Sequence, residues 1–359
     1  MNLSQAAPPL KTEVVKVNPR NPEKEIISRA AEVIRNGGLV AFPTETVYGV
    51  GADALNPEAV KKIFQAKGRP SDNPIIVHIA QPEHLKGLTE DIPPLATELM
   101  NKFWPGPLTL ILKKSGRVPL VVTGGQNTVA VRMPRNKVAL ALITSFGGPI
   151  AAPSANLSGY PSGTTAGHVF QDLRGKIDMI LDAGAVEVGV ESTVLDISMH
   201  PPVILRPGAV TPEQLETVIG EVTLGKRKQL LKRSPGTRYR HYSPKAEVIL
   251  VKERDKCIEL AEKYASRGKK VGLVIHQPDF CMDRSVALVK IKIMPHDLEG
   301  YARAMFATLR ELDEQGVEHI IVEAVEEKGI GIAIMDRLRR AASSESWQET
   351  KRTKRRKAG

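Results

Sequence analysis

Apolar residues in the first two thirds of the chain follow both helical and strand-like spacing. Two stretches at helical spacing, 24–36 and 57–66, predict helices, and Gly37-Gly38 ends the first of them. Short apolar runs bounded by turn residues predict buried strands at 39–42, 75–80, 108–113, 129–134, 177–184, 192–198 and 203–210. A capped helix at 211–219 closes this unit, which the mixture of elements predicts to be α/β with a curved or mixed sheet.

The pattern changes after residue 246. Strand-like runs alternate with helical runs, which predicts a small α/β domain with a parallel sheet. The predicted strands are 247–251, 270–276, 286–291 and 317–325, and the predicted helices are 257–268, 299–316 and 331–343. We therefore divide the chain into an N-terminal extension (1–20), a first domain (21–222), a linker (223–245), a second domain (246–345) and a basic tail (346–359).

The net charge of +11 is concentrated in two short segments. Residues 225–233 carry five basic residues and residues 351–359 carry six, with no acid in either. Such runs attract phosphate polymers without reading their sequence, so contact with RNA is one interpretation. Solvated segments that aid solubility have the same composition, and both interpretations stay open.

The remaining composition is that of an ordinary globular protein, with 42% hydrophobic and 25% charged residues. No apolar run is long enough to span a bilayer, and the first residues lack the apolar core of a secretory signal. The two cysteines, Cys257 and Cys281, do not form a disulfide framework. We therefore expect a cytoplasmic protein without a membrane partner.

Several catalytic signatures are missing from the sequence. Residues 220–226 have the spacing of a phosphate-binding loop, but Arg227 stands where Ser or Thr would hold Mg²⁺, and the segment follows a helix. No HExxH, CxxC or GxSxG motif occurs. We expect no metal ion bound by the protein and no catalytic triad.

Cationic and small polar residues interrupt the apolar pattern at a few places. Lys67-Gly68-Arg69 lies in a turn between a helix and a strand, where it can bind an anion, although a solvated turn has the same composition. Arg132 and Arg206 each interrupt a strand-like run, so each must be paired or face a cavity. His78 lies in an apolar strand near that turn, and the small residues of 151–165 suit a backbone nest for an anion. Together these residues indicate a polar pocket for an anionic ligand.

Seven short motifs follow one another between residues 43 and 208. They are Pro43-Thr44-Glu45-Thr46-Val47-Tyr48-Gly49, Lys67-Gly68-Arg69-Pro70 with Asn73-Pro74, Trp104-Pro105-Gly106-Pro107-Leu108-Thr109, Val131-Arg132-Met133-Pro134, Ala152-Pro153-Ser154-Ala155-Asn156-Leu157-Ser158-Gly159, Glu191-Ser192-Thr193-Val194 and Leu205-Arg206-Pro207-Gly208. In this order they resemble the YrdC-like family of threonylcarbamoyl-AMP synthases. Residues 234–244 also resemble the linker of its two-domain members, and residues 329–342 resemble the end of their C-terminal domain.

The resemblance implies a fold and a set of site residues. The first domain would be a YrdC-like twisted mixed sheet with helices, and the second a smaller Rossmann-like parallel α/β domain. L-threonine would be bound by Thr46, His78, Arg132, Ala152 and Ser192. ATP would be bound by Lys67, Arg69, Asn73, Thr128, Ser154, Ser162 and Arg206, of which Lys67 and Arg69 would also be catalytic. Tyr239 and His241, in the linker, would belong to a lid over the pocket.

The resemblance also implies a reaction. L-threonine, bicarbonate and ATP would give threonylcarbamoyl-AMP and pyrophosphate, with Mg²⁺ carried by the nucleotide. A tRNA threonylcarbamoyl transferase machinery would use the product for N6-threonylcarbamoyladenosine. Two other functions stay open: a carbamoyl-transfer enzyme of the same fold, and a double-stranded RNA-binding module.

Overall fold

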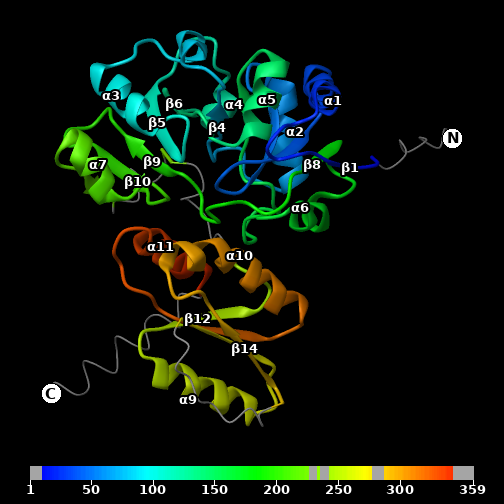
Figure 1. Cartoon of the computed structure of the whole chain (residues 1–359), viewed down its shortest axis with the longest axis vertical. Coiled ribbons are helices and arrows are strands. Elements are labelled where there is room, and N and C mark those ends of the chain that lie inside the picture. Colours follow the sequence, from blue (N-terminus) through cyan, green and yellow to red (C-terminus); the bar gives the residue numbers. More distant parts are fainter. Residues whose placement is uncertain (1–9, 226–232, 235–241, 277–286, 343–359) are drawn as a thin grey trace.

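The computed structural model describes residues 10–225, 233–234, 242–276 and 287–342. These residues form two parts (Figure 1), an N-terminal part around a large sheet and a smaller C-terminal part around a second sheet. The proposed lid residues, most of the basic segment 225–233 and the whole basic tail lie outside the described residues. None of the described helices is both long enough and apolar enough to cross a membrane.

In the described residues, eleven strands form the large sheet, in the order β1-β8-β2-β3-β7-β4-β6-β5-β9-β10-β11. Their bounds are β1 Glu13–Lys16, β2 Val40–Pro43, β3 Tyr48–Asp53, β4 Ile76–His78, β5 Leu108–Lys113, β6 Thr128–Arg132, β7 Ile150–Ala151, β8 Met179–Asp182, β9 Thr193–Asp196, β10 Val203–Arg206 and β11 Thr223–Leu224. Parallel pairs such as β4 with β6 alternate with antiparallel pairs such as β5 with β6. The predicted mixed sheet is confirmed.

The helices of this part lie around the sheet. They are α1 Lys24–Arg35, α2 Pro57–Lys67, the 3-10 helix η1 Pro82–Gly87, α3 Pro94–Phe103, α4 Leu120–Thr123, α5 Lys137–Phe146, α6 Ala166–Leu173 and α7 Pro212–Ile219. Helix α2 has clear ends, because the Asn56 side chain caps it and Gly68, at φ 61°, ends it. The end of α2 therefore fixes where the cationic turn, Lys67-Gly68-Arg69, begins.

The C-terminal part has four described strands that are parallel throughout, in the order β12-β15-β13-β14. Its elements are β12 Glu247–Val251, α9 Arg254–Ala265, β13 Val271–Ile275, β14 Val289–Ile293, α10 Leu298–Glu314, β15 His319–Glu323 and α11 Gly331–Ala341. The alternating pattern thus predicted this domain correctly, including its parallel sheet.

Some elements were not predicted. β3 lies between the predicted strand 39–42 and the predicted helix 57–66, where we predicted no strand. This strand is rich in small residues, because a Cβ on Gly51 would lie 2.6 Å from Ile150 and 2.7 Å from Phe42. We also missed α3, α5 and α6, and nearly continuous apolar sequence hides the helical period of α5. β1, within the segment assigned as an extension, pairs with β8.

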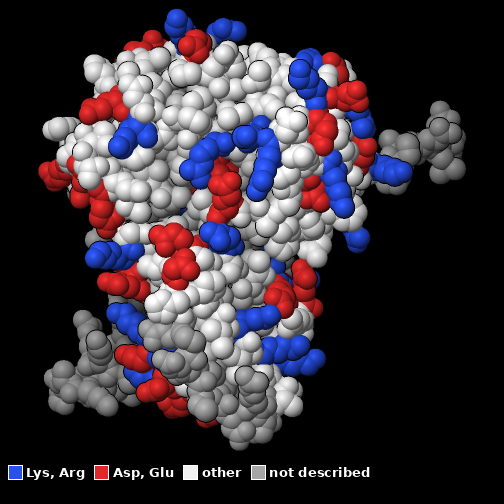
Figure 2. Space-filling model, viewed as in Figure 1, with Lys and Arg blue, Asp and Glu red and all other residues white. Residues whose placement is uncertain are grey.

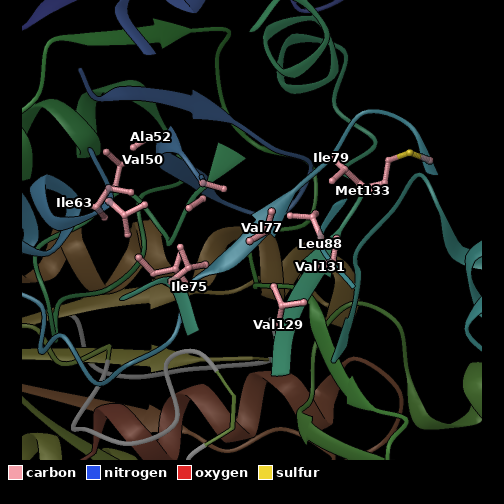
Figure 3. Close-up of a cluster of buried hydrophobic side chains, with 14 of the residues drawn as sticks. Val50, Ala52, Ile63, Ile75, Val77, Ile79, Leu88, Val129, Val131 and Met133 are labelled. Carbon is pink, nitrogen blue, oxygen red and sulfur yellow. The ribbon is translucent and has the colours of Figure 1, made fainter. Parts of the chain in front are cut away.

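The core is mostly aliphatic, and its centre lies around β4 and β6. Figure 3 shows Val77 and Val131 among these side chains, and the two residues are register partners on the neighbouring strands. Both are fully buried, as is Ile79, which follows β4. Close aliphatic packing fixes these strands firmly, so residues at their ends are held in place.

The two parts share a packed interface. Val47 and Val190 belong to the same buried cluster as Tyr301 and Phe306 of α10. A buried ion pair crosses the interface, in which Arg310 of α10 donates to both carboxylate oxygens of Asp172, at 3.1 and 2.6 Å. Because both side chains are nearly inaccessible to water, the pair fixes the relative position of α10 and α6.

We predict that Arg310→Ala lowers the free energy of unfolding by about 3 kcal/mol or more, because it leaves the Asp172 carboxylate buried and unpaired. Urea denaturation of the full chain measures this loss. Arg29→Ala is the matched control, since its pair with Glu13 is about half exposed and is worth less than about 1 kcal/mol. Equal losses in the two variants would contradict the prediction.

Candidate active site

A cleft opens beside β3, β4, β6 and β10 in the described residues. It is lined by Thr44, Thr46, Val47, Tyr48, Gly49, Arg69, Ile76, His78, Arg132, Ala152, Pro153, Ser154, Glu191, Ser192, Arg206 and Tyr242. Residues far apart in sequence therefore converge on one cavity, as an active site requires.

Strand register explains part of this convergence. His78 and Arg132 are register partners at the ends of the parallel strands β4 and β6. On the other side of β4, the antiparallel strand β7 pairs Ile150 with His78 and Ala151 with Val77, so Ala152 follows directly. Neighbouring strand ends thus present a histidine, an arginine and a small residue at one place.

Arg132 is buried and held by three partners. Its Nη2 lies 2.7 Å from Glu45 Oε1, its Nη1 donates to Thr46 Oγ1 at 3.0 Å, and its Nε donates to the Gly106 carbonyl at 3.1 Å. Glu45 and Thr46 belong to the loop between β2 and β3, in which the Thr44 hydroxyl donates to the Val47 carbonyl. The loop and the guanidinium therefore fix each other.

His78 is a buried histidine that faces the cleft. Burial first, and then the positive charge of Arg132, lower its pKa to about 3. The ring is therefore neutral at physiological pH, and its Nδ1 has no hydrogen-bond partner among the described residues. A buried polar atom of this kind normally has a partner, so it is available to a ligand.

Arg69 and Arg206 bring two more positive charges to the cleft. Arg69 Nη2 donates to the Pro74 carbonyl at 2.8 Å, and Arg206 Nη2 donates to the Ser192 carbonyl at 3.0 Å. Burial, followed by the charge of Arg206, lowers the pKa of Arg69 to about 10. Because buried like charges repel each other, a bound anion between or beside these two arginines is favoured.

The position of Arg206 depends on the glycine two residues later. A Cβ on Gly208 would lie 2.3 Å from the Thr193 nitrogen and 2.4 Å from the Glu191 carbonyl oxygen. Only glycine permits this close approach, which brings the end of β10 against the segment before β9. The Leu205–Gly208 and Glu191–Val194 motifs therefore form one structural unit.

Lys67 has a different position from the one expected of a catalytic residue. Its ammonium is buried, donates to the carbonyls of Ser154 (at 2.6 Å) and Asn156, and is not among the residues that line the cleft. Burial, and then the charge of Arg69, lower its pKa. In this arrangement Lys67 holds the polar loop (residues 151–165), which lines the cleft with Ser154.

The structure brings together most of the site residues named from the sequence. Thr46, Arg69, His78, Arg132, Ala152, Ser154, Ser192 and Arg206 line the cleft. Lys67, Asn73, Thr128 and Ser162 do not. Tyr239 and His241 lie outside the described residues, so the lid assignment stays a prediction.

Sequence reasoning gave no role to eight residues of the cleft wall, and Glu191 and Tyr242 are two of these with contacts to the C-terminal part. Glu191 belongs to the Glu191–Val194 motif, and an acidic residue beside an apolar strand could have indicated a site residue. Its carboxylate accepts from the Ser162 hydroxyl and from Arg337 of α11. Tyr242, at φ 64°, lines the cleft and stacks on Phe306 of α10 at 5.2 Å, a position that the sequence does not reveal.

No cluster of metal-ligating side chains accompanies the cleft. In the parts of the chain that the structure describes, no three His, Cys, Asp or Glu residues are grouped so that they could hold a metal ion. The chemistry that this cleft offers is the binding of anions by arginines, together with hydroxyl and amide hydrogen bonds.

Two family profiles match nearly all of the described chain. The family described as "Telomere recombination" matches residues 32–208. The family described as "Threonylcarbamoyl-AMP synthase, C-terminal domain" matches residues 210–343. Between them the two matches include every residue that lines the cleft.

Characterised sequences and structures are similar over both parts. Threonylcarbamoyl-AMP synthase of Pyrococcus abyssi is 52% identical over 323 residues, which are 87% of this chain and 93% of that protein. The Bacillus subtilis protein of the same name is 47% identical over 88% of this chain and 92% of its own length. A solved structure of P. abyssi Sua5 complexed with L-threonine has a TM-score of 0.87 at 48% identity, and covers 92% of this chain and 98% of that one. The chain therefore belongs to the threonylcarbamoyl-AMP synthase family, in its two-domain form.

Proposed function

We propose that this chain condenses L-threonine, bicarbonate and ATP to threonylcarbamoyl-AMP and pyrophosphate. The observation that carries the proposal is the convergence of Arg69, Arg132 and Arg206 on one cleft. ATP, bicarbonate and the threonine carboxylate are all anions, and buried guanidinium groups are the side chains best suited to bind them. Family membership supplies the identity of the reaction.

The chemistry proceeds in two steps. The threonine amine first combines with bicarbonate, which gives an N-carboxy-threonine and water. An oxygen of this carbamate then attacks the α-phosphorus of ATP, the bond to the β-phosphate oxygen breaks, and pyrophosphate leaves. Both steps require two reactants to be held in line, and the second also requires positive charge near the transferred group.

We assign the threonine subsite to Thr46, His78, Arg132, Ala152 and Ser192. All five residues line the cleft, and Arg132 donates a hydrogen bond to Thr46. The Ser192 hydroxyl also shares a hydrogen bond with Thr109 at 2.8 Å. A neutral His78 suits this position, because it can bond to an uncharged hydroxyl or amine of the substrate without adding a further charge.

We assign the nucleotide subsite to Lys67, Arg69, Asn73, Thr128, Ser154, Ser162 and Arg206, with Lys67 and Arg69 as the catalytic residues. Of these, Arg69, Ser154 and Arg206 line the cleft. Mg²⁺ would enter with the phosphates, and the described residues contain no cluster to hold it otherwise. Tyr239 and His241 would cover the bound substrates, because both the carbamate and the mixed anhydride product react with water.

The remaining partners are also proposals. The product requires an acceptor enzyme, for which we propose the tRNA threonylcarbamoyl transferase machinery, in the cytoplasm. On the face shown in Figure 2, Lys and Arg are interspersed with Asp and Glu, so this face does not favour a double-stranded RNA-binding module. RNA contact through the basic segments 225–233 and 351–359 stays a proposal.

The first prediction concerns the reaction itself. We expect pyrophosphate release from ATP and bicarbonate to depend on L-threonine, and L-serine to replace it poorly. A coupled pyrophosphate assay measures this directly. Pyrophosphate release that does not depend on L-threonine would contradict the proposal and favour a carbamoyl-transfer enzyme.

The second prediction concerns the cationic turn. Arg69→Ala should weaken ATP binding by roughly 10- to 100-fold, the scale expected when a charge-assisted hydrogen bond is lost, while the fold is retained. Isothermal titration with ATP measures this. Lys61→Ala is the control, because Lys61 is an exposed cation on the neighbouring helix α2. Unchanged affinity in Arg69→Ala would remove this turn from the site.

The third prediction concerns the neutral His78. Because its pKa is lowered to about 3, the unfolded chain takes up a proton below pH 6.5 that the folded chain does not. Stability should therefore fall as pH falls from about 6.5 towards 4, with a slope of up to about 1.4 kcal/mol per pH unit from this group. In His78→Asn the slope should be correspondingly smaller, as measured by urea denaturation at several pH values. Equal slopes would show that His78 titrates normally in the folded protein.

A further inference from the structure

A buried arginine of the C-terminal part reaches the wall of the cleft. Arg337 of α11 is 1% exposed and is one of the largest fully buried side chains among the described residues. Its Nε donates to Glu191 Oε2 at 2.8 Å, and its Nη2 donates to the Pro207 carbonyl at 2.9 Å. Its guanidinium also lies 5.4 Å from the centroid of the Tyr242 ring. One side chain therefore contacts three separate segments at the cleft.

Glu191 poses an electrostatic problem for the cleft. Its carboxylate lines a cavity whose proposed ligands are anions. Burial raises its pKa, but the positive charges of Arg337 and Arg206, with hydrogen bonds from Ser162 and Arg337, outweigh burial and lower it to about 2. Glu191 is therefore ionised at physiological pH. Without a paired cation, this negative charge would repel the phosphates of a nucleotide.

We propose that Arg337 is a positioning residue for the reaction, supplied to the active site by the C-terminal domain. By pairing with Glu191 it neutralises that carboxylate, so that the charges of Arg206 and Arg69 act on the nucleotide. It does not touch the substrate, since it is not among the residues that line the cleft. This inference rests on the proposed function, because it presumes that the cleft binds ATP.

The surrounding contacts support a role through Glu191. The third guanidinium nitrogen of Arg337, Nη1, also has a partner within the protein, because it donates to Asp336 at 2.6 Å. Glu191 Oε1 accepts from Ser162, which belongs to the polar loop that lines the cleft. Arg206, in turn, donates to the carbonyl and the hydroxyl of Ser192, the next residue after Glu191. A change in the position or charge of Glu191 is thus transmitted to both the loop and Arg206.

The pair between Arg310 and Asp172 provides a natural comparison. It also joins the C-terminal part to the N-terminal part through a buried arginine and a carboxylate. Neither residue lines the cleft. Arg310 also donates to the Pro161 carbonyl, in the loop that follows Ser154. Loss of this pair leaves the charge of the cleft wall unchanged, so it should lower stability and weaken nucleotide binding less than loss of the Arg337 pair.

The test measures binding of α,β-methylene-ATP to the full chain by isothermal titration, with thermal unfolding of every variant. We expect Arg337→Gln to weaken binding roughly tenfold or more, the scale of one uncompensated charge at an effective dielectric constant of about 20. The double variant Arg337→Gln with Glu191→Gln should recover most of the affinity, because it removes both charges. Arg337→Lys should bind nearly as well as the unchanged protein.

Three results would overturn the inference. They are unchanged affinity in Arg337→Gln, a double variant that binds as weakly as Arg337→Gln, and an equal loss of affinity in Arg310→Gln. If Arg337→Gln does not fold, Glu191→Gln alone decides, since it should bind the analogue at least as tightly as the unchanged protein. A loss of affinity in Glu191→Gln would also contradict the inference, because it would show that the pair supports the geometry of the cleft and does not act by neutralising charge. Absence of binding by the unchanged protein would instead contradict the proposed function.

Discussion

Placing several guanidinium groups out of contact with water is the constraint on which this cleft depends. A buried charge without partners is strongly unfavourable, so each arginine must be hydrogen-bonded or paired. Arg69 and Arg206 donate to backbone carbonyls, which satisfy their N–H groups without cancelling their charge. Arg132 is instead paired with Glu45. The cleft therefore keeps a net positive character while each of these arginines has a partner.

The sheet allows the arginines to be buried, because its backbone provides their hydrogen-bond acceptors. Strand ends provide carbonyl groups at fixed positions, and the mixed order of the sheet brings distant segments side by side. Gly208 allows the end of β10 to approach the segment before β9, and the Ser192 carbonyl then becomes the acceptor for Arg206. The small residues in these motifs are thus needed for backbone contact, and the arginines depend on that contact for their partners.

Sequence patterns predicted the fold class and much of the cleft, but for different reasons. Alternation of strands and helices was sufficient to predict a parallel sheet in the C-terminal part, because a helix between two strands returns the chain for parallel pairing. It did not predict the strand order, in which β15 lies between β12 and β13. Cationic residues that interrupt apolar runs indicated a polar pocket, and the resemblance of short motifs assigned Arg69, His78, Arg132 and Arg206 to one site. The position of Lys67 behind the polar loop was not predictable, because a helix end gives no information about which carbonyl its side chain will reach.

Local sequence is even less informative about contacts between the two parts of the structure. Glu191, Tyr242 and Arg337 are far apart in sequence, and nothing in their local context indicates a common site. Tyr242 lines the cleft, stacks on Phe306 of α10 and lies beside the guanidinium of Arg337. A wall residue held in this way by the second domain is in place only when the two domains are docked. The C-terminal domain therefore needs no ligand site of its own to matter for catalysis, because docking completes the wall of the cleft and balances its charge.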